Sequence, residues 1–370
     1  MSLQYIFGGS GAGKSTYLYN SIIKESIKNP LENYIIVVPE QYTMATQKRV
    51  VELHPRKGVL NIDVVSFERL AYKVFEEVGA ADYPVLDDTG KNLIVRRVLE
   101  QNKKALRFFG SNISNTGFVS ELKSVISEML QYDISVDKLL DINKNVDNNS
   151  LLGMKLDDIS LIYGGFREFI KNNYITSEEI LDLMCRKVTE SSKIRGSVIA
   201  FDGFTGFTPV QYRLMAILLD MCKEVKVALT IDISEHVNIN EGIESLFYMT
   251  KDTVAHLNRI CDEGHINVDK VTVGEDTVLT RFAASKELAF LEKNIFRPGL
   301  RYYSGKVNDI VMYAGITPKD EIQYVSGEIL KLTRLQGFRY NEIAVVTGDI
   351  SVYGKLAANI FAQNDIPYFL

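Results

Sequence analysis

The chain has 370 residues, of which 46% are hydrophobic and 24% charged, and its formal net charge is −5. This composition is typical of a globular protein, and the length favours two or three domains over one core. No apolar run approaches the ~18 residues that a membrane-spanning helix needs, and the net charge argues against general attraction to nucleic acid. We therefore expect a cytoplasmic protein without a membrane segment.

The first predicted elements are a strand at residues 3–7 and a helix at residues 15–26, joined by a glycine-rich loop. The loop reads GGSGAGKST and matches the phosphate-binding pattern G-x-x-x-x-G-K-[ST]. Its backbone N–H groups and the positive end of the helix would surround a phosphate. A surface turn is the alternative reading, but the flanking strand and helix argue against it. The predicted nucleotide-binding residues are Gly8, Gly9, Ser10, Gly11, Ala12, Gly13, Lys14, Ser15 and Thr16.

Two residues of this loop have specific predicted roles. Lys14 would bridge the β- and γ-phosphates of ATP, and the Ser15 hydroxyl would hold Mg²⁺. Both roles require a triphosphate at the amino end of the helix. ATP and Mg²⁺ are therefore the predicted cofactors.

Strand and helix patterns alternate through residues 1–82. Alternation of this kind indicates a parallel sheet covered by helices, so the predicted fold class is α/β, and with the loop a P-loop NTPase. The further predicted strands are 34–38 and 62–65, and the further predicted helices are 44–53 and 67–78, the last with Ser66 as its N-cap.

From residue 83 to residue 193 the strand-like runs give way to helical spacing of apolar residues. We predict an all-helical insertion, with helices at 118–132 and 152–170 separated by a polar loop at 143–150. The β/α pattern then resumes at residues 194–300. The elements predicted there are strands at 197–201 and 225–231 and helices at 209–221, with Thr208 as cap, and at 288–296.

Asp202 directly follows the predicted strand 197–201. A phosphate-loop protein needs an acidic side chain at such a position to hold Mg²⁺, directly or through water. An ordinary Asp-Gly turn is the alternative reading. The next residue is Gly203, where motor ATPases commonly have a glutamate base, and a missing base costs roughly 10²–10⁴ in rate. We therefore expect a site that binds ATP and hydrolyses it slowly or not at all.

Residues 301–370 predict the start of a second α/β domain. A half-built sheet leaves edges and apolar faces uncovered, so we expect this domain to be truncated and the chain to be part of a longer protein. The predicted elements are strands at 309–313, 343–347 and 366–370 and helices at 320–335 and 353–363.

The three cysteines and four histidines match no metal-ligand spacing. Cys185, Cys222 and Cys261 are far apart in the sequence and are typical of buried, reduced thiols. We therefore predict no metal site built from a cluster of protein side chains.

Several segments together resemble one known family. The phosphate loop is followed by VVPEQYT at 37–43, VVSFERLAYKVF at 64–75, FDGFTGFTPVQY at 201–212 and EIAVV at 342–346. This combination is similar to the N-terminal part of AddB, which belongs to the bacterial AddAB ATP-dependent helicase/deoxyribonuclease. The resemblance implies a superfamily 1 helicase-like layout: domain 1A in residues 1–82 and 194–300, a 1B-like insertion in 83–193, and the start of domain 2A in 301–370.

The same resemblance implies partners and further sites. It implies an AddA-type subunit that carries the active motor, contact with double- and single-stranded DNA, and processing of double-strand ends for recombinational repair. Gln41, Tyr42 and Thr43 stand where such helicases place a loop that contacts single-stranded DNA. The nuclease domain and iron–sulfur cluster of the family are expected only beyond this chain.

Three alternative functions stay open. One is an active ATP-dependent DNA motor with an unrecognised base. Another is a small-molecule phosphotransferase of the P-loop class, although the large helical insertion argues against it. The third is an assembly module whose phosphate loop is vestigial.

Overall fold

The computed structural model describes residues 1–79, 84–111, 113, 115–147, 149–171, 174–239, 242–274, 280–297, 299 and 301–369. The chain divides into two compact units, Met1–Ala284 and Ser285–Leu370. Each unit is built on its own hydrophobic clusters.

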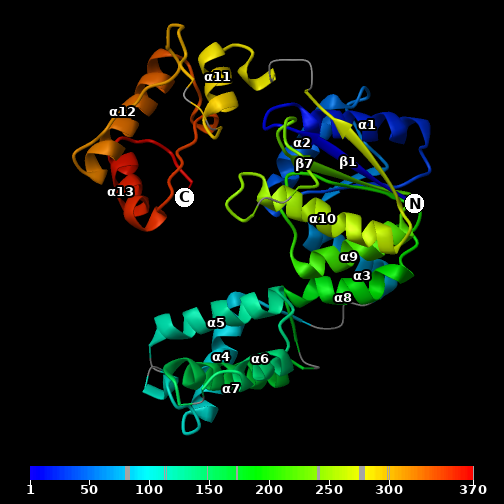
Figure 1. Cartoon of the computed structure of the whole chain (residues 1–370), viewed down its shortest axis with the longest axis vertical. Helices are drawn as coiled ribbons and strands as arrows, with labels where there is room; N and C mark the ends of the chain where they lie inside the picture. Colours follow the sequence, from blue (N-terminus) through cyan, green and yellow to red (C-terminus); the bar gives the residue numbers. More distant parts are fainter. Residues whose placement is uncertain are drawn as a thin grey trace. The chain divides into compact units, whose positions relative to one another are not determined.

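A six-stranded sheet organises the first unit, and Figure 1 shows its strands running between layers of helices. Its order is β3-β2-β6-β7-β1-β8, and the pairings described are all parallel. The predicted α/β class with a parallel sheet is therefore confirmed. The carboxyl ends of parallel strands meet at one edge of the sheet. The strands are β1 Ser2–Gly8, β2 Tyr34–Val37, β3 Ile62–Val65, β6 Val198–Phe201, β7 Glu224–Thr230 and β8 Asn267–Thr272.

Alternate side chains of the central strands enter two separate cores, one on each face of the sheet. Helices α1 (Lys14–Lys28) and α2 (Thr43–Leu53) pack on the face that holds Ile36 and Ala200. Burial on both faces explains the nearly continuous apolar runs in these strands. The opposite face is covered by α3 Phe67–Val78, α8 Glu179–Lys187, α9 Pro209–Met221 and α10 Tyr248–Glu263.

Four helices that lie between strands β3 and β6 in the sequence form a bundle with a hydrophobic core of its own. Each of these helices has an N-cap residue whose side chain accepts a backbone N–H of the first turn, which is the usual way to give these N–H groups a hydrogen-bond partner. Two short strands, β4 Val85–Leu86 and β5 Ile175–Thr176, pair in parallel within the stretch predicted to be helical throughout. The helices are α4 Asp88–Asn102, α5 Thr116–Gln131, α6 Val136–Lys144 and α7 Leu151–Ile170.

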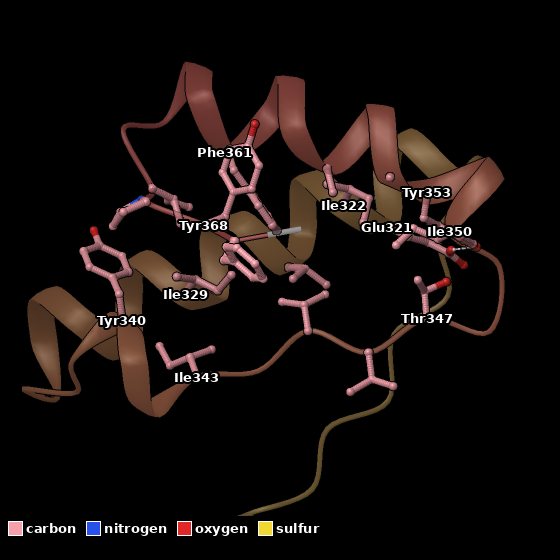
Figure 2. Close-up of a pocket in the computed structure, with 18 of the residues that line it drawn as sticks. Glu321, Ile322, Ile329, Tyr340, Ile343, Thr347, Ile350, Tyr353, Phe361 and Tyr368 are labelled. Atoms are coloured by element: carbon pink, nitrogen blue, oxygen red, sulfur yellow. Dashed lines mark hydrogen bonds between the residues drawn. The ribbon is translucent and has the colours of Figure 1, made fainter. Parts of the chain in front are cut away.

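The second unit consists of helices α11 Lys286–Asn294, α12 Pro318–Leu335 and α13 Ile350–Gln363, and its described residues form no strand. Helices α12 and α13 pack against each other through a small apolar core. Figure 2 shows the space beside them, into which Ile329, Ile343 and Phe361 point. This cavity has a volume of about 1050 Å³ and is lined mainly by aliphatic and aromatic side chains.

The strands predicted in the second unit were wrong. Residues 309–313 and 343–347 have no strand hydrogen bonds, and neither have 366–369, while Leu370 lies outside the described residues. These segments have the composition of strands, but a strand also needs a neighbour to pair with. The composition of a segment therefore predicted its strand character and not its pairing.

In the first unit the sequence predicted most elements to within about two residues. The helices at 67–78 and 209–221 have the predicted bounds, and Ser66 accepts the backbone N–H of Arg69 as predicted. Helices α4, α6 and α8 were not predicted as separate elements, and helix α10 and strand β8 were missed. Strand β8 lies at the edge of the sheet and is mostly exposed, so its sequence lacks an apolar run. Among the described helices none has the length and apolar character that crossing a bilayer requires.

Candidate nucleotide-binding site

The predicted phosphate loop lies at the carboxyl edge of the sheet. Strand β1 ends at Gly8, and α1 begins at Lys14. Two glycines between them are in the left-handed region, Gly11 at φ 84° and Gly13 at φ 93°. A residue with a side chain would be strained at either position, so the backbone favours glycine at Gly13, a fixed position of the motif, and at Gly11, a variable one.

Among the described residues, the amino end of α1 has no side-chain cap, which is also true of α2, α8 and α10 in this unit. The residue that precedes α1 is Gly13. Helix α3 is capped by Ser66 and α4 by Asp87, whose side chains accept a first-turn N–H. The first N–H groups of α1 therefore lack a side-chain acceptor and, with the helix dipole, favour an anion.

Lys14 folds back onto the loop. Its Nζ donates to the carbonyl oxygens of Gly8 and Gly9, at 2.9 Å each. Burial lowers the pKa of Lys14, the carboxylate of Asp202 opposes that effect, and the guanidinium of Arg281 adds to it. A phosphate would offer Lys14 a charged acceptor in place of two neutral carbonyls, and such hydrogen bonds are the stronger ones.

Asp202 and α1 meet at this edge through a residue that the sequence did not single out. Asp202 follows β6, is 6% exposed, and its Oδ2 accepts the hydroxyl of Tyr19 at 2.5 Å. Burial and the adjacent carboxylate raise the pKa of Tyr19, so the phenol stays protonated and donates. The Ser15 hydroxyl lies beside the same phenol. The structure thus brings Ser15 and Asp202 to one place.

Gly203 has a conformational reason to be glycine. Its φ is 80°, and a Cβ there would lie 3.5 Å from Cδ of Pro39 and 3.6 Å from Cδ2 of Tyr42. A side chain at this position would be strained by the backbone and would contact the segment that follows β2. The position at which motor ATPases commonly have a glutamate is therefore a glycine in a left-handed bend of the chain.

The segment after β2 presents some predicted DNA-contact residues to solvent and buries another. Gln41 and Tyr42 lie in the 3-10 helix Glu40–Tyr42, and the exposed fraction of Tyr42 is 51%. Thr43 is buried, and its hydroxyl donates to the carbonyl of Glu40 at 2.6 Å. Thr43 therefore holds the segment together, whereas Gln41 and Tyr42 are accessible.

The cysteines lie apart in the core of the first unit. Cys185 is on α8, Cys222 follows α9 and Cys261 is on α10, and all three are buried. Burial raises the pKa of Cys222 and of Cys261 to about 11, so these thiols stay protonated. In the described part of the chain, no three His, Cys, Asp or Glu side chains gather as a metal site would require. The cysteines therefore do not fit an iron–sulfur cluster.

Comparison with known proteins gives one consistent match. A family model described as "ADDB, N-terminal" matches residues 5–292. A protein of Lachnoclostridium phytofermentans, named as the B component of an "ATP-dependent helicase/deoxyribonuclease", is 41% identical over the whole chain. Proteins of the same name from Clostridium novyi and Clostridioides difficile are 32% and 34% identical over the whole chain. The chain spans about a third (32%) of the length of each of these relatives.

Proposed function

The chain belongs to the AddB N-terminal family, and on that premise we propose that it is the ATP-binding, helicase-like region of a helicase–nuclease subunit. Its relatives are named as one of the subunits of an ATP-dependent helicase/deoxyribonuclease. In this proposal the chain works with an AddA-type subunit on double- and single-stranded DNA, at double-strand ends that are processed for recombinational repair.

The open amino end of α1 is the observation that carries the ATP-binding proposal. The loop offers backbone N–H groups, Lys14 offers a cation, and two left-handed glycines allow the backbone to approach an anion. Ser15 and Asp202 would hold Mg²⁺, which neutralises phosphate charge when bound. The pairing of Asp202 with Tyr19 orients its carboxylate toward α1 and fits this role.

We propose weak or absent hydrolysis for the same site. The position after Asp202 carries no carboxylate, and its φ of 80° disfavours a side chain there. Asp202 accepts the Tyr19 hydroxyl and is the proposed metal ligand, so it is poorly suited to act as the base. A bound ATP would then serve to hold a conformation and not to drive movement.

The layout is proposed as that of a P-loop, superfamily 1-like helicase. Domain 1A would comprise residues 1–82 and 194–300, with the 1B-like insertion at 83–193 and the start of domain 2A at 301–370. The separate core of helices α4 to α7 supports the insertion. The compact unit that begins at Ser285 supports a domain boundary near the proposed one.

Gln41 and Tyr42 are proposed to contact single-stranded DNA. Both are exposed at the edge that holds the phosphate loop, and an aromatic ring can stack on any base. We expect Tyr42→Ala to weaken binding of an oligonucleotide about tenfold, within the range known for base stacking. Tyr132→Ala is a matched control, since Tyr132 is 52% exposed on the helical bundle. Equal losses in both variants would argue against a specific role for Tyr42.

Titration calorimetry of the chain with Mg·ATP, followed by an ATPase assay with and without single-stranded DNA, tests the central proposal. We expect Mg²⁺-dependent ATP binding and little turnover in either assay. Turnover stimulated by DNA would favour the active motor, and turnover that needs a small-molecule acceptor would favour a phosphotransferase. No binding at all would indicate a vestigial loop and would contradict the proposal.

Introducing a base at position 203 is a second test of weak hydrolysis. Gly203→Glu combines a carboxylate with backbone strain, so Gly203→Ala is needed as its control. We expect ATP turnover to rise in the glutamate variant relative to the alanine variant. Equal turnover in the two variants would mean that the missing base at position 203 is not the cause of slow hydrolysis.

A further inference from the structure

An arginine that belongs to no motif lies against the phosphate loop. Strand β8 pairs with β1, and the backbone N–H of Val273, just after β8, donates to the carbonyl of Phe7 at 2.8 Å. The next described segment is the 3-10 helix Thr280–Phe282. Its residue Arg281 lies at the loop, 271 positions after Ser10 in the sequence.

Arg281 contacts the loop at Gly11 and Ser10. A Cβ built on Gly11 would lie 2.9 Å from Cβ of Arg281 and 3.2 Å from its Nε, so the arginine stem rests directly on the glycine. Its Nη1 donates to Oγ of Ser10 at 3.4 Å, which is a long and weak hydrogen bond. The guanidinium can therefore exchange this partner for a better acceptor at little cost.

Two cations then flank a loop that is built to hold an anion. Arg281 is exposed, and across the described ranges its guanidinium forms no ion pair. The charge of Arg281 is felt at Lys14, whose ammonium lies on the Gly8 and Gly9 carbonyls. A phosphate oxygen between the two side chains would relieve their repulsion. A guanidinium can also bind two phosphate oxygens at once.

The contact point indicates which phosphate is concerned. The first N–H groups of α1 begin at Lys14, whereas Arg281 contacts the loop three and four residues earlier, at Gly11 and Ser10. A phosphate group at the helix and a phosphate group at Arg281 would thus be two different phosphates of the same nucleotide. Since the loop amides and the helix end take the α- and β-phosphates, the terminal phosphate is the one that remains for the guanidinium.

We propose that Arg281 is a second phosphate-binding cation of this site, which contacts the terminal phosphate and makes the loop prefer ATP to ADP. This inference rests on the proposed ATP-binding function. It adds a residue from outside the loop and a specificity that the loop motif alone does not provide.

Titration calorimetry of the chain with a Mg²⁺-bound, non-hydrolysable ATP analogue and with Mg·ADP tests the inference. We expect Arg281→Ala to weaken binding of the analogue at least tenfold and to change ADP binding by less than twofold. Arg281→Lys keeps the positive charge but cannot bind two phosphate oxygens at once, so its affinity for the analogue should lie between those of the wild type and Arg281→Ala. Arg259→Ala, which removes another exposed arginine of the same unit, should change neither affinity.

Other results would overturn the inference. Equal losses for both nucleotides would place the arginine away from the terminal phosphate. Unchanged binding in Arg281→Ala would mean that Arg281 lies beside the loop without contacting the nucleotide. Tighter binding would mean that Arg281 hinders the nucleotide from entering the site. Because Arg281 is exposed, each variant should keep the wild-type melting temperature. If the wild-type chain binds neither nucleotide, the proposed function fails, and this inference fails with it.

Discussion

The predicted phosphate loop of the first unit and the cavity of the second unit differ in whether the helices beside them have side-chain caps at their amino ends. At the loop, a complete sheet fixes the start of α1 with its amino end open. At the cavity, both long helices have side-chain caps, Thr317 for α12 and Asp349 for α13. The hydroxyl of Tyr353 there donates to Glu321 at 2.6 Å. Tyr353 and Glu321 line the cavity and are already paired with each other, so the volume of the cavity does not by itself indicate a binding site.

The largest expected effect concerns how firmly the two regions are packed. Phe201 is fully buried and ends β6 beside Phe67, Phe204 and Phe207. We expect Phe201→Ala to cost about 3–5 kcal/mol of unfolding free energy. Phe361 lines the cavity of the second unit, so it has fewer contacts to lose, and Phe361→Ala should cost about 1–2 kcal/mol.

Urea denaturation followed by circular dichroism measures this pair of variants. The two units can unfold in separate transitions, so each variant is compared with the wild-type transition that it shifts. An equal cost for both substitutions would mean that the cavity is filled in solution. The contrast between the regions would then be lost.

The next largest effect tests the chemistry of the loop. Lys14→Ala should weaken ATP binding about 100-fold, because it removes the charged donor to the phosphates. Stability should change by less than about 1 kcal/mol, since Lys14 bonds only two carbonyls of a partly exposed loop. Calorimetric titration and thermal melting give the two quantities. Lys24→Ala, an exposed lysine of the same helix, is the control, and equal affinities for the two variants would refute the role of Lys14.

A smaller effect is expected at the contact between α1 and β6. Tyr19→Phe removes the hydroxyl that Asp202 accepts at 2.5 Å, and leaves a buried carboxylate short of a donor. We expect a loss of about 1.5–3 kcal/mol in the nucleotide-free protein. Mg·ATP should reduce this loss, because a metal ion would engage the same carboxylate. Tyr17→Phe, on the exposed side of α1, serves as the control in the denaturation series.

The smallest effect concerns a carboxylate of the same unit that lies away from the loop. Burial raises the pKa of Glu77, but hydrogen bonds from Ser191, Ser192 and Lys193 outweigh it and lower the pKa to about 2. A depressed pKa gives stability that is present above the unfolded value near 4.5 and is lost as the pH falls toward 2.

Glu77→Gln should therefore lower stability at pH 7 by about 1 kcal/mol, after allowance for solvent screening, and flatten the acid side of the stability curve. Its ATP affinity should stay within twofold of wild type, because Ser191 to Lys193 precede β6 at the amino end of that strand. Denaturation at several pH values measures the first effect. Parallel curves for variant and wild type would contradict it.

The accuracy of the sequence predictions follows the range of the interactions involved. The helix at 67–78 was predicted correctly because its apolar spacing and its Ser66 cap are local signals. The segments 309–313 and 343–347 were predicted as strands from composition, but strand pairing needs a second segment. Strand β8 was missed because its place at the edge of the sheet leaves it mostly exposed and polar.

The same rule divides the candidate site. Residues 2–28 contain a strand, a glycine loop and a helix in succession, and the positive φ angles at 11 and 13 favour glycine there. The sequence does not distinguish Tyr19 from other apolar residues of α1, because its role depends on a distant partner. Asp202 lies 183 residues from Tyr19, and Arg281 lies 271 residues from Ser10.

The sequence by itself therefore determined the glycine loop proposed to bind a phosphate, since the loop depends on local backbone angles and on one helix end. Only the tertiary structure decided which distant side chains surround it. The physical reason is the parallel sheet, which gathers the carboxyl ends of its strands at one edge whatever their separation along the chain. Strand order is a property of packing between segments, and no single segment encodes it.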